Sequence, residues 1–289
     1  MVDATLRQGN RLIELVLKAD DSPQFIQNLI ERWGAVQLIG RGEVSQSDLL
    51  EALSHIKTNA QGAQALQGQP LYILEQVRLL SEMFSQLDIS HVEENITTAT
   101  AQLMPGASLF CYVRTTTMAT HFGIKKPWDN FGDLTEKTVG LLVSRRKFYN
   151  YRAGQFGAVN YRLLASTAIA MQELEAQQKG DIIVIPAQLG ELYMGKTVET
   201  SRDLIGKSGS QFCLPAFIVG QILLVNPEIL TSNRNLFVDC PGDKYRLGAR
   251  EPFNDTLYFD VDENGLLCLD SSWTSAPYGL CGSAWGVFQ

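Results

Sequence analysis

Histidine is scarce in this sequence, which has only His55, His91 and His121 among its 289 residues. No two of them stand at helical i, i+4 spacing and no His-Glu-x-x-His run occurs, so the sequence offers no helical zinc pair. Charged residues are also few, at 19% of the chain against a usual share of about 25%. The net charge of −7 argues against a general nucleic-acid coat, because phosphate affinity needs an excess of cations.

A long apolar run is missing as well. The longest nearly apolar stretch is Leu214 to Val225, which includes Gln221 and is too short to cross a hydrocarbon layer of ~30 Å. The first residues show no basic start followed by an apolar stretch, so we expect no secretory signal. We therefore expect no membrane association, and a location in the cytoplasm or within an intracellularly assembled particle.

Cysteine occurs without the spacing that disulfides or zinc would favour. The five cysteines are odd in number, widely spread and free of any Cys-x-x-Cys pair. We expect reduced and mostly buried thiols, and no metal site. The residues concerned are Cys111, Cys213, Cys240, Cys268 and Cys281.

The chain changes character near Pro105-Gly106. Before this point apolar residues recur at helical spacing, and after it short apolar runs and turn signals alternate with helical patterns. The sequence predicts an α+β fold, with a helical region at 1–104 and a mixed α/β domain at 105–289. Within the second region, Leu257–Asp262 and Leu266–Asp270 flank Glu263-Asn264-Gly265 and predict a β-hairpin.

Other elements follow from local pattern. Short apolar runs predict strands at Leu109–Val113, Asp181–Pro186 and Leu236–Asp239. Helical spacing predicts a helix over Val159–Gln177, whereas 118–133 holds Gly, Pro and Trp without a period and is expected to be a structured loop.

One segment matches the phosphate-loop pattern G-x-x-x-x-G-K-[ST]. It runs from Gly190 through Gly195 and Lys196 to Thr197, after an apolar run and before a predicted helix. In a working site the loop amides face phosphate oxygens, Lys196 neutralises their charge and Thr197 reaches Mg²⁺. The alternative interpretation is a surface loop that joins a strand to a helix, with Lys196 in solvent.

An aspartate follows the next apolar run. Asp239 ends Leu236-Phe-Val-Asp, which suits an acid that binds Mg²⁺ in a nucleotide site. The run Val238 to Gly242 resembles the switch segment of translational GTPases. Together with the loop, this resemblance implies a nucleotide-binding protein that uses Mg²⁺ and ATP or GTP as cofactors; the other interpretation requires no cofactor.

A second segment mixes cations with aromatic residues. Guanidinium groups there could hold phosphates while tyrosines stack on bases, or the same residue types could form a protein interface, where Arg and Tyr are enriched. Because the chain is acidic overall, we favour the protein interface. The candidates are Arg145, Arg146, Lys147, Tyr149, Tyr151 and Arg152.

Three functions therefore compete. The one we favour is a non-enzymatic structural or assembly protein that associates with itself and with other proteins, as a subunit of a larger homo-oligomer such as a virion or similar particle. A P-loop nucleotide-binding protein that uses the loop at 190–197 is the first alternative. A nucleic-acid-binding accessory protein that uses residues 145–152 is the second.

Overall fold

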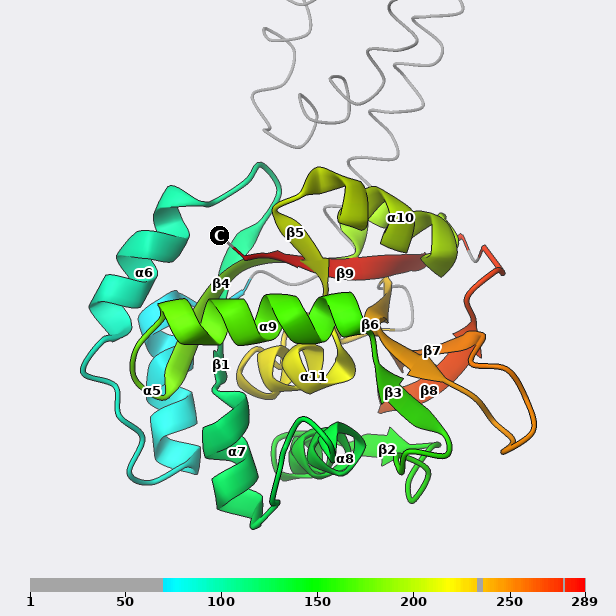
Figure 1. The fold of residues 1–289 in the computed structure, drawn as a ribbon, viewed down its shortest axis with the longest axis horizontal. Coiled ribbons are helices and arrows are strands. Elements are labelled where there is room, and N and C mark those ends of the chain that lie inside the picture. The colour runs from blue at the N-terminus through cyan, green and yellow to red at the C-terminus, as the bar shows by residue number, and fades with distance from the viewer. Residues whose placement is uncertain (1–69, 233–235, 278, 289) are drawn as a thin grey trace, which may run out of the picture. The chain divides into compact units, whose positions relative to one another are not determined.

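One mixed sheet runs through the part of the chain that the structure describes (Figure 1). The computed structural model describes residues 70–232, 236–277 and 279–288. The strands follow the order β1-β4-β9-β6-β7-β8-β2, with β3 on β6 and β5 on β9. Their bounds are β1 Ser108–Val113, β2 Phe148–Asn150, β3 Tyr161–Leu163, β4 Ile182–Leu189, β5 Gln211–Cys213, β6 Phe237–Tyr245, β7 Asp255–Val261, β8 Leu267–Trp273 and β9 Cys281–Val287.

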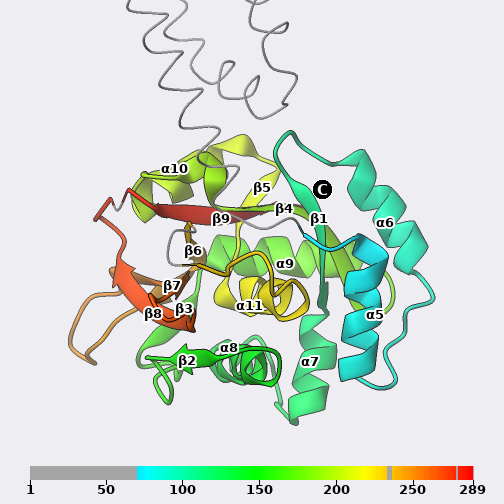
Figure 2. The ribbon, with the colours of Figure 1, turned by 180° about the vertical axis from the view of Figure 1, so that it is seen from behind.

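Helices cover both faces of this sheet. The side chains of Val238 and Phe259 share one face, where Gly220 of α11 comes close to the Phe259 ring, while Asp239 points to the other face, beneath α10. Figures 1 and 2 show α11 in the middle of the part that the structure describes, with α8 and α10 on opposite sides of it. The helices are α5 Ile73–Met83, α6 Val92–Ala101, α7 Thr115–Phe122, α8 Phe131–Gly140, α9 Ala165–Gln177, α10 Val198–Ser208 and α11 Ala216–Val225, with short 3-10 turns η1 Leu141–Ser144 and η2 Glu191–Tyr193.

Helix α11 is buried along its whole length and forms the centre of the core. A buried carboxylate meets its N-terminus: Asp243 accepts hydrogen bonds from the Ala216 amide at 2.7 Å and the Tyr161 hydroxyl at 2.5 Å. Burial raises the pKa of Asp243 to about 7, although these two bonds and Arg202 favour its charged form. The carboxylate satisfies an N-terminal amide that would otherwise lack an acceptor.

The β1 end of the sheet is covered by glutamine side chains. Gln76 of α5 accepts from the Cys111 amide at 3.3 Å and donates to the Leu109 carbonyl at 3.1 Å. Gln221 of α11 accepts from the Val113 amide at 2.8 Å. These bonds satisfy the outer backbone groups of an edge strand, which would otherwise invite further strand pairing.

The predicted α+β class is confirmed, with helices and a mixed sheet. Strands β1 and β4 lie where apolar runs predict them, and β7 pairs with β8 in the predicted hairpin. The helix expected over Val159–Gln177 starts only at Ala165, because Tyr161–Leu163 pairs with β6. The structured loop expected over 118–133 is shorter and covers 123–130, since α7 reaches Phe122 and α8 begins at Phe131.

The expected helical region 1–104 lies largely outside the described residues, so its boundary with 105–289 stays a prediction. The described part of that region, α5 and α6, packs against β1 and β4. No helix among the described residues is both long and apolar enough to span a membrane.

Candidate interaction surface

The segment after α8 forms an exposed ridge of cationic and aromatic side chains. Val143 is 68% exposed, Tyr149 54% and Tyr151 52%. The two tyrosine rings meet edge to face with centroids 4.7 Å apart, and Arg145 and Lys147 are exposed beside them. We call these five residues the β2 ridge. Since side chains alternate along an extended strand, Lys147, Tyr149 and Tyr151 project from one face of the chain.

Two cations from the same predicted segment have structural roles instead. Arg146 donates to the carbonyls of Pro227, at 2.8 Å, and Leu230, and burial lowers its pKa. Arg152 pairs with Asp270 at 2.5 Å, and both side chains are largely covered. These two guanidinium groups are directed into the protein and are not available to a partner.

The remaining cations of the β2 ridge are Arg145 and Lys147. Neither Arg145 nor Lys147 forms an ion pair with an acid in the described ranges. An exposed aromatic pair next to unpaired cations is the composition found at interface hot spots. Of the six predicted patch residues, the structure therefore brings Arg145, Lys147, Tyr149 and Tyr151 together at the surface.

The predicted phosphate loop makes its hydrogen bonds within the protein. Five successive amides already have acceptors, at 2.8–3.3 Å: Leu192 donates to Gln188 Oε1, Tyr193 to Gly190 O, Met194 to Glu191 O, Gly195 to Cys281 O and Lys196 to Tyr193 O. A phosphate at this loop would have to displace several of these bonds. Lys196 is exposed, as in the surface-loop interpretation.

The residue type at each end of the loop has a local structural explanation. Gly190 has φ +101° and its backbone lies against that of Gly282, so that a Cβ on Gly190 would stand 2.3 Å from the Gly282 carbonyl oxygen. Thr197 is the N-cap of α10, where its Oγ1 accepts from the Thr200 amide at 3.1 Å. Gly190 and Thr197 of the pattern are thus accounted for by chain packing and helix capping.

Asp239 lies near the loop but beneath helix α10. It is only 2% exposed, and it sits directly across from Ser283 on the parallel neighbour β9, whose Cys281 carbonyl accepts from Gly195. Burial raises the pKa of Asp239 to about 7, partly offset by the charge of Arg202. The structure therefore brings the predicted acid to the same end of the sheet as the loop while covering it almost completely.

The other chemistry-bearing residues are part of the packing. All five thiols are free and buried, as expected, and burial raises the pKa of each. His121 lies on α7 and packs edge to face against Phe84 and Phe122. Across the described stretches, no group of three or more His, Cys, Asp or Glu side chains is placed to hold a metal ion.

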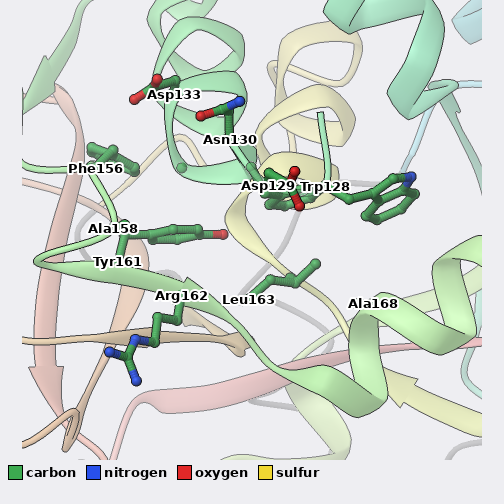
Figure 3. Close-up of a pocket in the computed structure, with 13 residues that line it drawn as sticks. Trp128, Asp129, Asn130, Asp133, Phe156, Ala158, Tyr161, Arg162, Leu163 and Ala168 are labelled. Carbon is green, nitrogen blue, oxygen red and sulfur yellow. The ribbon is translucent and has the colours of Figure 1, made fainter. Parts of the chain in front are cut away.

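A hollow of about 470 Å³ lies at the other end of α8 (Figure 3). Its wall consists of the turn that leads into α8, together with residues around Phe156, strand β3 and the start of α9. Sequence reasoning missed it, because its residues come from separate segments. The one local signal was Trp128 in a stretch without a helical or strand period.

Comparisons with known proteins assign this chain to no group. No family model matches it, and no curated protein or solved structure is significantly similar to it.

Proposed function

We propose that this protein is a non-enzymatic assembly subunit that associates with further copies of itself through the β2 ridge. The observation that carries the proposal is the ridge itself, in which an exposed tyrosine pair lies next to two unpaired cations. Burying the pair would remove apolar surface from water and give each ring a packing partner. The setting we propose is the cytoplasm or an intracellularly assembled particle.

The contrast between the two ends of the sheet supports a contact at β2. At β1 the glutamine side chains of α5 and α11 occupy the edge. At β2 the strand is short and ends the sheet, and its flanking residues are exposed. An end of the sheet that exposes aromatic side chains is a surface that a partner can cover.

The charge count favours a protein partner over nucleic acid. Arg146 and Arg152 are held by internal carbonyls and by Asp270, which leaves two cations for phosphates. The affinity of a protein for nucleic acid grows with the number of phosphates that it neutralises. Two exposed cations on a chain of net charge −7 supply little of this term.

Light scattering coupled to size-exclusion chromatography tests the proposal on the full chain. Wild-type protein should show a mass above that of the monomer, rising with concentration. The double substitution Tyr149→Ser with Tyr151→Ser should return it toward the monomer at the same concentration. The matched control is Tyr72→Ser, since Tyr72 is 73% exposed, precedes α5 as its N-cap residue and is not part of the β2 ridge.

A wild-type protein that stays monomeric at high concentration would overturn the proposal. So would a double variant that associates as strongly as the Tyr72→Ser control. The ridge residues are exposed, so circular dichroism and urea unfolding should be unchanged in all three proteins. That check separates a lost contact from a lost fold.

A further inference from the structure

The hollow at the start of α8 combines aromatic walls with acidic side chains. Trp128 stacks on Phe131 with ring centroids 5.7 Å apart, and Phe156 and Tyr161 close the interior side. Figure 3 shows Asp129 and Asp133 on the side of the helix turn, across from strand β3. A concave site of this size with aromatic walls and few charged groups is typical of a binding pocket.

The cation that lines the hollow is directed elsewhere. The guanidinium of Arg162 lies 4.2 Å from the centre of the Phe253 ring, on which Arg246 also packs at 4.4 Å. In Figure 3 the Arg162 side chain points away from Asp129 and Asp133. Neither aspartate forms an ion pair with a base of the described ranges. The pocket therefore presents unpaired negative charge and π faces, both of which attract a cation.

The same chain carries the complementary surface. The β2 ridge has two unpaired cations and two exposed rings, and it follows the opposite end of α8. Helix α8 has ten residues, so its length of about 15 Å separates the hollow from the start of the ridge. An exposed cationic surface and a concave acidic one at different places on one chain can form a heterologous contact.

We propose that the hollow at Trp128–Asp133 receives the β2 ridge of a second copy, so that copies join head to tail. Arg145 or Lys147 of one copy pairs with Asp129 and Asp133 of the next, and the tyrosines cover the exposed part of Trp128. This inference rests on the proposed function and adds the surface that the ridge contacts. A heterologous contact of this kind closes into a ring or continues as an open chain.

Charge reversal tests the pairing in the full chain. One variant carries Asp129→Lys with Asp133→Lys, and the other carries Arg145→Glu with Lys147→Glu. Each alone should associate at least about tenfold more weakly than wild type in sedimentation velocity, because like charges then face each other. An equal mixture should regain assembly, since every contact between the two variants again joins opposite charges.

The control is Glu173→Lys with Asp203→Lys, which makes the same change in net charge at exposed positions on α9 and α10. It should associate as wild type does. If the wild type associates and the pocket variant matches this control, the head-to-tail contact is wrong while the ridge remains the interface. An equal mixture of the two charge-reversal variants that stays dissociated would likewise show that the head-to-tail contact is wrong. A monomeric wild type instead overturns the proposed function, and this inference with it.

Discussion

Gly190 and Gly282 bring the backbone of a loop into contact with that of strand β9. A Cβ on Gly282 would stand 2.1 Å from the Gly190 carbonyl oxygen, closer than real Cβ atoms approach backbone. Only a residue without a side chain fits, and the contact fixes how the loop leaves β4. The first glycine of the phosphate-loop pattern therefore has a packing role that needs no ligand.

Gly282→Ala should lower the free energy of unfolding by about 2–3 kcal/mol, because the obstructing atom belongs to the backbone and cannot rotate away. Urea unfolding followed by circular dichroism measures the change. Gly157→Ala is the control, since nothing lies within 4 Å of its added Cβ. Equal urea midpoints for Gly282→Ala and Gly157→Ala would show that the backbones at Gly190 and Gly282 can move apart with little loss of stability.

Asp239 makes the stability of the protein depend on pH. Its pKa is about 7 in the folded protein, because burial disfavours the charge, against about 4 in an unfolded chain. The folded state therefore holds the proton more tightly. The resulting stabilisation is complete below about pH 4 and is lost as the pH rises through about 7.

The free energy of unfolding of the wild type should fall between pH 5 and pH 8. In Asp239→Asn this fall should be smaller by about 2–4 kcal/mol, because the amide has no charge to bury. Urea unfolding at both pH values gives the difference. Asp203→Asn, at an exposed position on α10, should leave the wild-type pH dependence in place. A loss of stability as large in Asp239→Asn as in wild type would contradict the assignment.

At the scale of the element, α11 shows that a polar residue in an apolar helix can be essential to a neighbouring strand. Gln221 is fully buried, and its Oε1 accepts from the Val113 amide at 2.8 Å. Hydrophobicity alone would rank leucine above glutamine at this position. The amide instead supplies the hydrogen bond that the outer edge of β1 needs.

Gln221→Leu should destabilise the protein by about 2 kcal/mol, because it leaves the Val113 amide buried without an acceptor. The measurement is urea unfolding, together with hydrogen exchange at Val113, which should become faster. Gln172→Leu, at an exposed position on α9, serves as the control and should change little. A variant at least as stable as wild type would show that water or another group replaces the glutamine.

Elements whose signal is local could be predicted from the sequence. The apolar run at β4 and the Glu263-Asn264-Gly265 turn are sufficient to place a strand and a hairpin. Tyr161 shows the limit: its spacing to Leu164 and Ala168 fits a helix, yet Tyr161 pairs with Tyr245, far along the chain. That partner decides the conformation, and no window around Tyr161 contains it.

The interaction surface could be predicted only in part, because some of its contacts also come from distant parts of the chain. Composition alone singles out the segment 145–152, but it cannot tell an exposed cation from one that binds distant carbonyls. Arg146 bonds to the carbonyl of Pro227, whereas Arg145, its neighbour, is exposed. The pocket that we assign to the ridge is formed by residues from separate segments that meet in space, and only the folded chain shows it.

At the scale of the whole molecule, an assembly held by charge should respond to salt. Raising NaCl from 0.1 M to 1 M shortens the Debye length from about 10 Å to about 3 Å. The mean mass in light scattering should fall at the higher salt, because the ridge and the pocket attract each other through exposed charges. A mass that rises with salt would indicate a contact dominated by apolar surface instead.

The glutamines at β1 also limit what a collection of these molecules can build. A ribbon that continues from molecule to molecule through the ends of the strand order needs a free β1 as well as a free β2. The outward backbone groups of Leu109, Cys111 and Val113 already bond to Gln76 and Gln221, so main-chain pairing at β1 would first have to break these bonds. Copies that meet at their β1 ends must therefore be held together by side chains.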